Sequence, residues 1–370
     1  MLGVMIVGVI KETQPCEQRV GLVPSVVKAL VSKGVGVVVE AGAGVAAGFP
    51  DSHYTDAGAT VASAETVLND AGVIVHVAPP TADEVQRFKA GTTLISMVYA
   101  KRNTSVVATL ADRKIQVFAL DALPRITRAQ VMDVLSSQNN LAGYKAVIVG
   151  ANATGRIFPL MTTAAGTVKP ATILIYGAGV AGLQALATAR RMGAIVHVTD
   201  LRPETKEQVE SLGGRFVSVE GLDNVKVEGG YVAAATDDVL ARQKEAVNKV
   251  LFSADIVITT ALVAGGQAPC LITREQVQQM KPGSVIVDLA ADAGGNCECT
   301  TGSEPATVGN VTILGCPQLA ASLPTTASEL YAKNVQAFLT EIAPAGELDI
   351  NLENEIIAST LIVHNGEVRA

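Results

Sequence analysis

The sequence predicts an α/β protein of two domains, each built around a parallel sheet. Short apolar runs alternate with helical patterns along the chain, which is typical of repeated strand–helix–strand units. The 370 residues are enough to bury two separate hydrophobic cores. A glycine-rich turn stands at residues 177–182, and the first domain lacks a turn of this kind.

The first domain begins with apolar runs rich in β-branched residues. Strands are expected at Met5–Ile10, Gly36–Glu40, Val73–Val77, Thr93–Val98 and Ile115–Leu120. Helices are expected at Ser25–Ser32, Ser63–Asn69 and Thr104–Asp112. Pro24 suits the first turn of a helix. A longer pattern, Arg128–Val149 with Thr127 as its N-cap, predicts a helix leading into the second domain.

The second domain is organised around residues 171–202, ATILIYGAGVAGLQALATARRMGAIVHVTDLR. The predicted strand Thr172–Tyr176 runs into a GxGxxG turn, which a helix follows. In such a turn Gly177 bends the chain, Gly179 lets the backbone approach a pyrophosphate, and Gly182 allows close helix–strand packing. The helix N-terminus supplies N–H donors to the anion. The order of these parts predicts a Rossmann-like dinucleotide site.

Asp200 ends the next apolar run, Ala194–Val198, and bears on which dinucleotide is bound. A carboxylate there accepts hydrogen bonds from a ribose 2′-hydroxyl and repels a 2′-phosphate. Arg202 is a complication, because an arginine near this strand end can pair with the extra phosphate of NADP. The sequence favours NAD without excluding NADP.

The rest of the chain completes the two domains. Later strands are expected at Arg215–Val219, Asp255–Thr259, Ser284–Leu289 and Val311–Leu314. The long connection Glu220–Asp238 is either a lid or a disordered surface insertion. A helix is expected at Ala327–Ile342, followed by a terminal hairpin with Asn365-Gly366 at its turn. The predicted limits are residues 1–136 plus 324–370 for the first domain and 137–323 for the second.

Composition narrows the classes of function. The net charge of −7 and the pI near 5.2 argue against a nucleic-acid partner, which needs a clustered positive surface. The five cysteines are odd in number and scattered, which suits reduced thiols in a cytosolic setting. Cys297 and Cys299 form a CxC without a nearby histidine, so buried free thiols are expected and no metal site is predicted. Polar residues, prolines and glycines interrupt the long uncharged stretches, so no membrane span is expected.

Several segments carry a family resemblance. They include KETQPCEQRVGLVP near the start, PRITRAQVMDVLSSQNNLAGY at 124–144, MTTAAGTVKPATILIYGAGVAGLQALATARRMGA at 161–194, and MKPGSVIVDLAADAGGNCE further on. In order and spacing these resemble the NAD(H)-binding, alpha or first, component of proton-translocating nicotinamide nucleotide transhydrogenases. These proteins are related to the alanine dehydrogenases. The resemblance implies two Rossmann-like domains, the second with the glycine site.

The family resemblance also implies an activity. A hydride would pass directly between NAD(H) on this chain and NADP(H) on a partner component, coupled to proton translocation by a membrane component. A homodimer is expected on the same ground, as is a place on the cytoplasmic or matrix-like side, peripheral to a membrane through partner subunits. This chemistry needs no general base, because catalysis comes from holding two nicotinamide rings together with water excluded.

The resemblance assigns residues to the reaction site. Arg125 is assigned to the NAD, Gln130 to the side of the partner's nucleotide, and Asp133 and Ser136 to the nicotinamide carboxamide. On a helix, Gln130, Asp133 and Ser136 would form one polar stripe, which from spacing alone is typical of a solvated helix face.

The same resemblance assigns further cofactor contacts. Besides the three glycines, these are Val180, Ala181, Asp200, Leu201 and Arg202 at the pyrophosphate and adenosine ribose, Gly230 and Tyr231 in a mobile loop, and Gln243 and Leu262 elsewhere on the NAD.

An alanine dehydrogenase is the main alternative function, with a nucleotide-binding scaffold without turnover as the third. The arginine of the dehydrogenases is present as Arg19, and Asp292 corresponds to their aspartate. Their lysine position is Ala78, however, and their histidine position falls near Tyr99. Without these two groups, pyruvate could be neither oriented nor protonated in that family's way. His76 would share a strand face with Ala78, which leaves it open, although an ordinary half-buried histidine is the simpler interpretation. The intact set from Arg125 to Ser136 argues against the scaffold.

Overall fold

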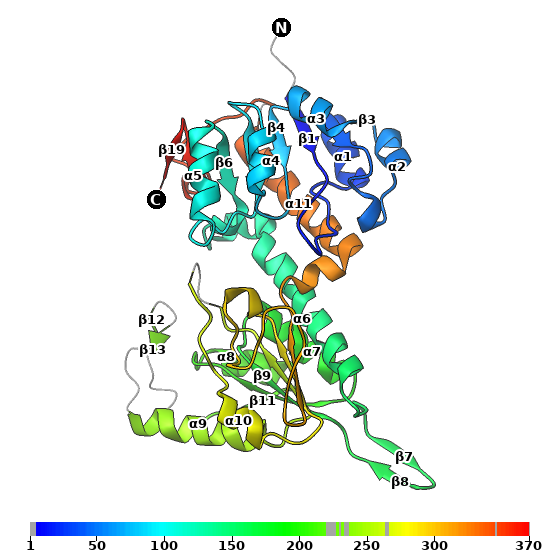
Figure 1. Ribbon diagram of the computed structural model, residues 1–370, viewed down its shortest axis with the longest axis vertical. Coiled ribbons are helices and arrows are strands. Elements are labelled where there is room, and N and C mark those ends of the chain that lie inside the picture. Colours follow the sequence, from blue (N-terminus) through cyan, green and yellow to red (C-terminus); the bar gives the residue numbers. More distant parts are fainter. Residues whose placement is uncertain are drawn as a thin grey trace. The chain divides into compact units, whose positions relative to one another are not determined.

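The computed structural model describes residues 5–219, 227–228, 231–232, 237–262, 266–344 and 346–369 (Figure 1). The chain divides into two compact units: unit 1 contains residues 1–138 and 320–370, and unit 2 contains residues 139–319. The first boundary lies inside helix α6 (Val134–Ala153). The limits predicted from sequence, 136/137 and 323/324, lie close to the boundaries of the two units.

Within the described residues, unit 1 is built on an eight-stranded sheet of order β19-β18-β6-β5-β4-β1-β2-β3. Its strands are β1 (Ile6–Val9), β2 (Gly36–Glu40), β3 (Thr60–Ala62), β4 (Val73–Val75), β5 (Thr93–Ser96), β6 (Gln116–Ala119), β18 (Leu361–His364) and β19 (Glu367–Val368). Strands β1 to β6 run parallel, and β18 and β19 add an antiparallel edge. The predicted terminal hairpin is this edge.

Helices lie between the strands of unit 1. They are α1 (Pro24–Val31), α2 (Asp51–Asp56), α3 (Ala64–Asp70), α4 (Ala82–Arg87), α5 (Thr104–Asp112), α11 (Pro324–Ile342) and α12 (Glu355–Thr360), with 3₁₀ turns η1 (Val45–Ala47), η2 (Leu120–Ala122) and η3 (Thr127–Met132). The short elements α2, β3, α4 and α12 were not predicted, because so few residues carry no clear periodicity.

The helix predicted at Arg128–Val149 is wrong at its start. Residues 127–132 form the 3₁₀ turn η3, and Asp133 leaves the helical conformation with ψ 89°. The Asp133 carboxylate accepts the Ser136 main-chain N–H at 2.9 Å, as an N-cap does, so α6 begins at Val134. Thr127 is therefore not the N-cap, and Gln130, Asp133 and Ser136 do not lie on one helix.

Within the described residues, unit 2 holds a seven-stranded sheet of order β11-β10-β9-β14-β15-β17-β16. Its strands are β9 (Thr172–Tyr176), β10 (Ile195–Thr199), β11 (Arg215–Phe216), β14 (Ile256–Thr259), β15 (Val285–Asp288), β16 (Ala306–Val308) and β17 (Val311–Gly315). All its neighbours pair in parallel except β16 with β17. Its helices are α7 (Val180–Arg191), α8 (Thr205–Ser211), α9 (Asp237–Leu251) and α10 (Arg274–Gln279), with the 3₁₀ turn η5 (Ala291–Ala293).

Both faces of the unit 2 sheet are covered. On β9, Ile173 and Ile175 belong to one hydrophobic core, and Leu174 and Tyr176 to the other. This double burial explains the continuous apolar runs in the sequence, because a parallel sheet covered on both faces has no solvated side. The predicted α/β class with Rossmann-like parallel sheets is confirmed.

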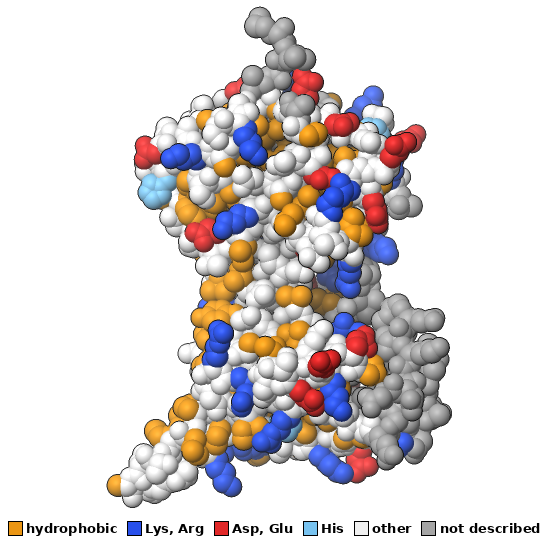
Figure 2. Space-filling model, turned by 180° about the vertical axis from the view of Figure 1, so that it is seen from behind, with side chains coloured by type: hydrophobic (Ala, Val, Ile, Leu, Met, Phe, Trp, Pro, Cys, Tyr) orange, Lys and Arg blue, Asp and Glu red, His pale blue; other side chains and the backbone are white. Residues whose placement is uncertain are grey.

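Two small hairpins complete unit 2. One pairs β12 (Val227–Glu228) with β13 (Tyr231–Val232), inside the connection predicted as a lid or insertion. The other pairs β7 (Met161–Thr163) with β8 (Gly166–Val168), and every residue of its two strands is exposed. It projects from the sheet of unit 2, and hydrophobic side chains lie along it at the lower left of Figure 2.

Candidate functional site

The glycine turn after β9 has the geometry that its sequence predicts. Gly177 has φ 100°, a left-handed conformation that favours glycine, and a Cβ there would collide with the Thr260 hydroxyl. A Cβ at Gly182 would collide with the carbonyl oxygen of Gly177. Gly179 is the N-cap of α7, and a Cβ there would meet nothing within 4 Å. The turn therefore brings α7 close against β9 and leaves open space at its tip.

The strand order places this turn where α/β sheets bind ligands. Strand β9 lies between β10 and β14, so the chain reverses its direction of winding there. Ligands bind outside the carboxyl ends of the strands at such a reversal. The N-terminus of the twelve-residue helix α7 faces the same edge, with Val180 40% exposed. Turn and helix together form a site suited to an anion such as a pyrophosphate.

Asp200 follows β10 and is held by donors from its own unit. Its Oδ2 accepts the Ala178 N–H at 2.7 Å, and Arg202 donates Nε and Nη2 to the two carboxylate oxygens at 2.9 Å each. Burial alone would raise the pKa of the Asp200 carboxyl, but these hydrogen bonds outweigh it and lower the pKa. Arg202 is thus paired with Asp200, while Leu201 between them is 44% exposed.

The other assigned residues of unit 2 differ in surroundings. Gln243 is buried and donates its Nε2 to the Val217 carbonyl at 2.7 Å, and its Oε1 has no hydrogen-bond partner among the described residues. Leu262 is 48% exposed just beyond β14. Gly230 lies outside the described residues, and for Tyr231 only the backbone in β13 is described.

The assigned residues of unit 1 surround the η3–α6 junction. Arg125 and Gln130 are exposed, and Asp133 and Ser136 are partly buried. Ser136 donates its hydroxyl to Asp133 at 2.5 Å in addition to its main-chain N–H. From α11, Asn334 donates to the Val131 carbonyl and accepts from Ser137, both at 2.8 Å. The junction is therefore fixed from both sides, which sequence spacing did not indicate.

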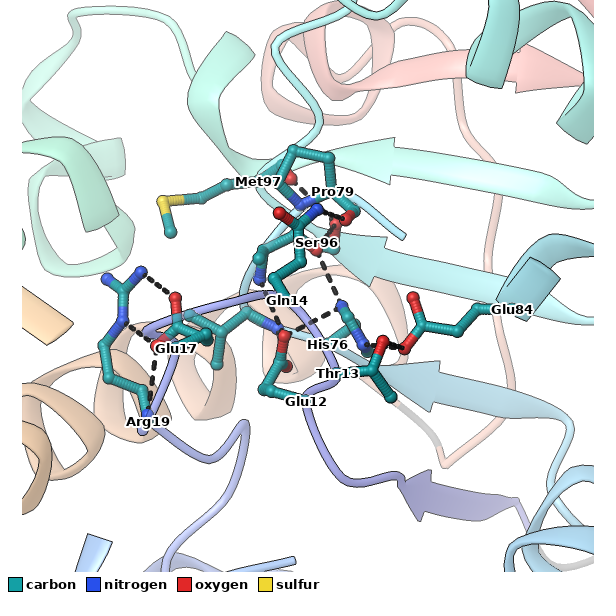
Figure 3. Close-up of polar contacts among 12 residues, drawn as sticks. Glu12, Thr13, Gln14, Glu17, Arg19, His76, Pro79, Glu84, Ser96 and Met97 are labelled. Carbon is teal, nitrogen blue, oxygen red and sulfur yellow. Dashed lines mark hydrogen bonds and ion pairs between the residues drawn. The ribbon is translucent and has the colours of Figure 1, made fainter. Parts of the chain in front are cut away.

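A buried charged cluster lies at the carboxyl ends of β1 and β4 (Figure 3). His76 is fully buried, which corrects the expected half-buried histidine, and lies between two buried carboxylates. Its Nδ1 is 3.3 Å from Glu12 Oε2 and 2.7 Å from the Ala78 carbonyl, and its Nε2 is 3.6 Å from Glu84 Oε1. The sequence offered one signal for Glu12, since it closely follows the first strand.

These contacts set the protonation of the cluster. Burial would lower the pKa of His76, but the charges of Glu12 and Glu84 outweigh it and raise the pKa to about 9. Burial raises the pKa of Glu12 to about 7 against the opposing charge of His76. For Glu84 the effect of His76 exceeds that of burial, and the pKa falls to about 2.

Arg19 lies beside this cluster and is fully engaged within unit 1. It donates Nε and Nη2 to Glu17 at 2.8 and 2.6 Å, and Nη1 to Gln138 Oε1 at 2.9 Å. Its guanidinium is 5% exposed. Ala78 supplies no amine at the position where alanine dehydrogenases have their lysine.

Metal and membrane sites are both missing from the described residues. No group of three His, Cys, Asp or Glu side chains in this part of the chain is arranged to hold a metal ion, and Cys297 and Cys299 are buried free thiols. No helix of the described ranges is long and apolar enough to cross a membrane.

Two Rossmann-like units, one with a glycine turn at its strand reversal, define a protein with a nucleotide-binding fold. The chain belongs to the alanine dehydrogenase/PNT family: residues 8–142 match the family's N-terminal domain and residues 146–370 its C-terminal domain. The resemblance predicted from sequence is confirmed.

Three relatives show where the chain lies within this family. An NAD(P) transhydrogenase alpha subunit of Rhodospirillum rubrum is 46% identical, over 98% of this chain and 97% of its own. The solved structure of a transhydrogenase from Sinorhizobium meliloti superposes with a TM-score of 0.91 at 44% identity, covering 98% of this chain and all of that one. The alanine dehydrogenase of Bacillus subtilis is 28% identical, over 98% of this chain and 92% of its own, and so is more distant.

Proposed function

We propose that this chain is the NAD(H)-binding component of a proton-translocating transhydrogenase. It would exchange a hydride directly between NAD(H) in unit 2 and NADP(H) on a partner component, with proton translocation by a membrane component. The observation that carries the proposal is the 46% identity to a transhydrogenase alpha subunit over 98% of the chain. The same proposal puts the protein on the cytoplasmic or matrix-like side of a membrane, attached through its partners.

The residues of unit 2 fit a bound dinucleotide. The turn of Gly177, Gly179 and Gly182 forms a cradle that Cβ atoms would fill, and α7 starts with Val180 and Ala181 at its mouth. The unpartnered Oε1 of Gln243 can accept a hydrogen bond from a ligand donor.

The Asp200–Arg202 pair favours NAD(H) over NADP(H). Because Arg202 gives two of its N–H groups to Asp200, the pair carries no net charge to attract a 2′-phosphate. The Asp200 carboxylate is the acceptor proposed for the ribose hydroxyls. Leu201 and Leu262 offer exposed apolar contact just beyond the ends of β10 and β14.

In the reaction the bound nicotinamide supplies the hydride chemistry, and this chain orients it. Asp133, fixed by Ser136 and the cap of α6, is proposed to hold the carboxamide with Ser136. The exposed Arg125 and Gln130 would face the NAD and the partner's nucleotide respectively. Orientation matters because hydride transfer requires the two rings in a reactive geometry. Gly230 and Tyr231 are proposed as part of a loop that closes over the nucleotide.

A homodimer is part of the proposal, and the β7–β8 hairpin supports it. A two-stranded hairpin is at best marginally stable in water by itself. This one has Leu160 62% exposed and Met161 43% exposed, with no side chain of its strands buried. A second copy of the chain is the proposed cover. Replacing residues 161–168 with a short polar loop should yield monomers in sedimentation; an unchanged dimer would contradict this role.

The alternative, an alanine dehydrogenase, finds little support in unit 1. Arg19 is bound to Glu17 and Gln138, and the positions of the dehydrogenase lysine and histidine are Ala78 and close to Tyr99.

The proposal is tested by binding and turnover. We expect the isolated chain to bind NADH more tightly than NADPH; a preference for NADPH would overturn the cofactor assignment. Mixed with an NADP(H)-binding partner, the chain should transfer hydride, whereas NADH with pyruvate and ammonia should give no turnover. Turnover in the second mixture would establish the dehydrogenase instead.

A single variant sharpens this test. Asp133→Asn should lower hydride transfer by about 10- to 100-fold while changing NADH affinity only a few-fold, because the carboxylate orients the ring at the reacting geometry. Arg128→Ala, an exposed change in the same η3 turn, is the control. Equal losses of rate and affinity in Asp133→Asn would count against the orienting role.

A further inference from the structure

We infer that Asn296 is a positioning residue for nucleotide binding, because it fixes the backbone beside Leu262 at the mouth of the unit 2 site. The inference rests on the proposed function for the identity of the ligand. Its structural part stands on the hydrogen bonds of Asn296 alone.

The Asn296 side chain acts as a clamp on the chain that follows β14. The residue is fully buried. Its Oδ1 accepts the Ala261 N–H at 3.0 Å, and its Nδ2 donates to the Ala261 carbonyl at 2.9 Å. The same Nδ2 donates to the Pro269 carbonyl at 2.8 Å. One amide therefore satisfies both main-chain groups of Ala261 and ties two points of the segment between β14 and α10.

Asn296 is itself held rigidly. Its main-chain N–H donates at 2.8 Å to Oδ2 of Asp288, a fully buried carboxylate at the end of β15. The same oxygen accepts from Thr300 Oγ1 at 2.7 Å, and Oδ1 accepts from Thr259 Oγ1 at 3.0 Å. The clamp is thus anchored to the carboxyl ends of β14 and β15, the two strands that continue the sheet beyond β9.

The clamped segment adjoins the glycine turn. Thr260, directly before Ala261, donates its hydroxyl to the Tyr176 carbonyl at 2.9 Å and occupies the space that a Cβ at Gly177 would need. Leu262, directly after Ala261, is 48% exposed. Fixing Ala261 therefore fixes both the wall of the turn and the exposed side chain offered to the nucleotide.

Only an amide fits these three contacts. The clamp needs one acceptor and two donors in a plane, which is what an asparagine side chain presents. Aspartate has the same shape but, when ionised, only accepts, so it would place a carboxylate oxygen against the Ala261 and Pro269 carbonyls. Asn296→Asp thus removes the clamp with almost no change in volume.

The experiment compares Asn296→Asp and Asn296→Ala with two controls in unit 2 of the full chain. Asn248→Ala removes another asparagine, which accepts from the Gln276 side chain at 2.6 Å and does not touch the clamped segment. Ile313→Val loses a buried methyl group on β17 and provides a loss of melting temperature for comparison. Each protein is assayed for melting temperature, amide hydrogen exchange at Ala261, and NADH dissociation constant.

We expect both Asn296 variants to lose exchange protection at Ala261 and to bind NADH about tenfold more weakly, since a buried polar group left without its partner is costly. Both controls should keep wild-type affinity at a comparable loss of melting temperature. Wild-type NADH affinity in the Asn296 variants would overturn the positioning role, as would unchanged exchange at Ala261. If the wild-type chain bound no NADH, the proposed function would fall, and the positioning role with it, while the exchange data would still report the clamp.

Discussion

The two units share one strand order and use its reversal point in opposite ways. In unit 1 the first six strands lie in the order β3-β2-β1-β4-β5-β6, and unit 2 repeats this pattern as β11-β10-β9-β14-β15-β17. Between β9 and α7 the chain makes a glycine turn with open space at its tip. Between β1 and α1 the longer loop instead places Glu12, Glu17 and Arg19 in the interior, all less than 9% exposed.

Each reversal point also has an acid two residues before an arginine. Glu17 and Arg19 form their ion pair with side chains 0% and 5% exposed, whereas Asp200 and Arg202 form theirs at 8% and 42%. The buried pair is bonded to Gln138 at the start of α6, so it supports the η3–α6 junction. The partly exposed pair remains next to the glycine turn. Fold and strand order are therefore compatible with a site but do not create one, since side-chain burial decides which reversal point is open.

The largest expected effect comes from breaking the buried pair. Arg19→Ala leaves the Glu17 carboxylate buried without its partner, so unit 1 should lose about 3–5 kcal/mol of stability, measured by urea unfolding. The double variant Glu17→Leu with Arg19→Met should lose less, because no unpaired charge remains. Equal losses in the two proteins would show that the unpaired charge is not the cause.

A smaller effect is expected in the Glu12–His76–Glu84 cluster, which unit 2 lacks at its own reversal point among the described residues. The pKa of His76 is raised to about 9, so its stabilisation is complete below its ordinary value of 6.5 and is lost as pH rises through 9. The raised pKa of Glu12 likewise makes stability fall as pH rises from 4.5 to about 7. Unit 1 should therefore unfold at lower urea concentrations at pH 9 than at pH 6.

Glu84→Gln tests the assignment of this pH dependence. Glutamine keeps the hydrogen bonds that cap α4, where Glu84 forms a capping box with Thr81, but it removes the charge. The pKa of His76, followed by NMR, should fall by about one unit, on the order of 1–2 kcal/mol. The loss of stability should then begin at lower pH. The exposed Glu65→Gln serves as control, and an unchanged pKa of His76 would rule out Glu84 as its partner.

The smallest effect is expected from the partly exposed pair. Arg202→Ala should cost no more than about 1 kcal/mol, since ion pairs open to solvent contribute little. Because the pKa of Asp200 is lowered, any stability that the pair gives is present above the ordinary value of 3.8 and lost as pH falls through the lower one. A loss near that of Arg19→Ala would erase the distinction between the two pairs.

Much of the fold could be predicted from local pattern. Strand Gly36–Glu40 and helix Thr104–Asp112 were predicted with their observed bounds. The failure at Arg128–Val149 has a local cause, since the Asp133 side chain competes for backbone donors and starts α6 afresh. The β7–β8 hairpin escaped prediction because its residues alternate no clear apolar face.

The candidate site was predictable only in part. By itself the sequence determined the alternation of strands and helices and the glycine turn, because periodicity, backbone sterics at Gly177 and the backbone contact at Gly182 are properties of neighbouring residues. Tertiary structure alone decided that His76 lies between Glu12 and Glu84, that Glu17 and Gln138 surround Arg19, and that Asn296 holds Ala261. These contacts join distant segments through strand order and register, and a buried polar group takes whichever partner that packing brings within hydrogen-bonding distance.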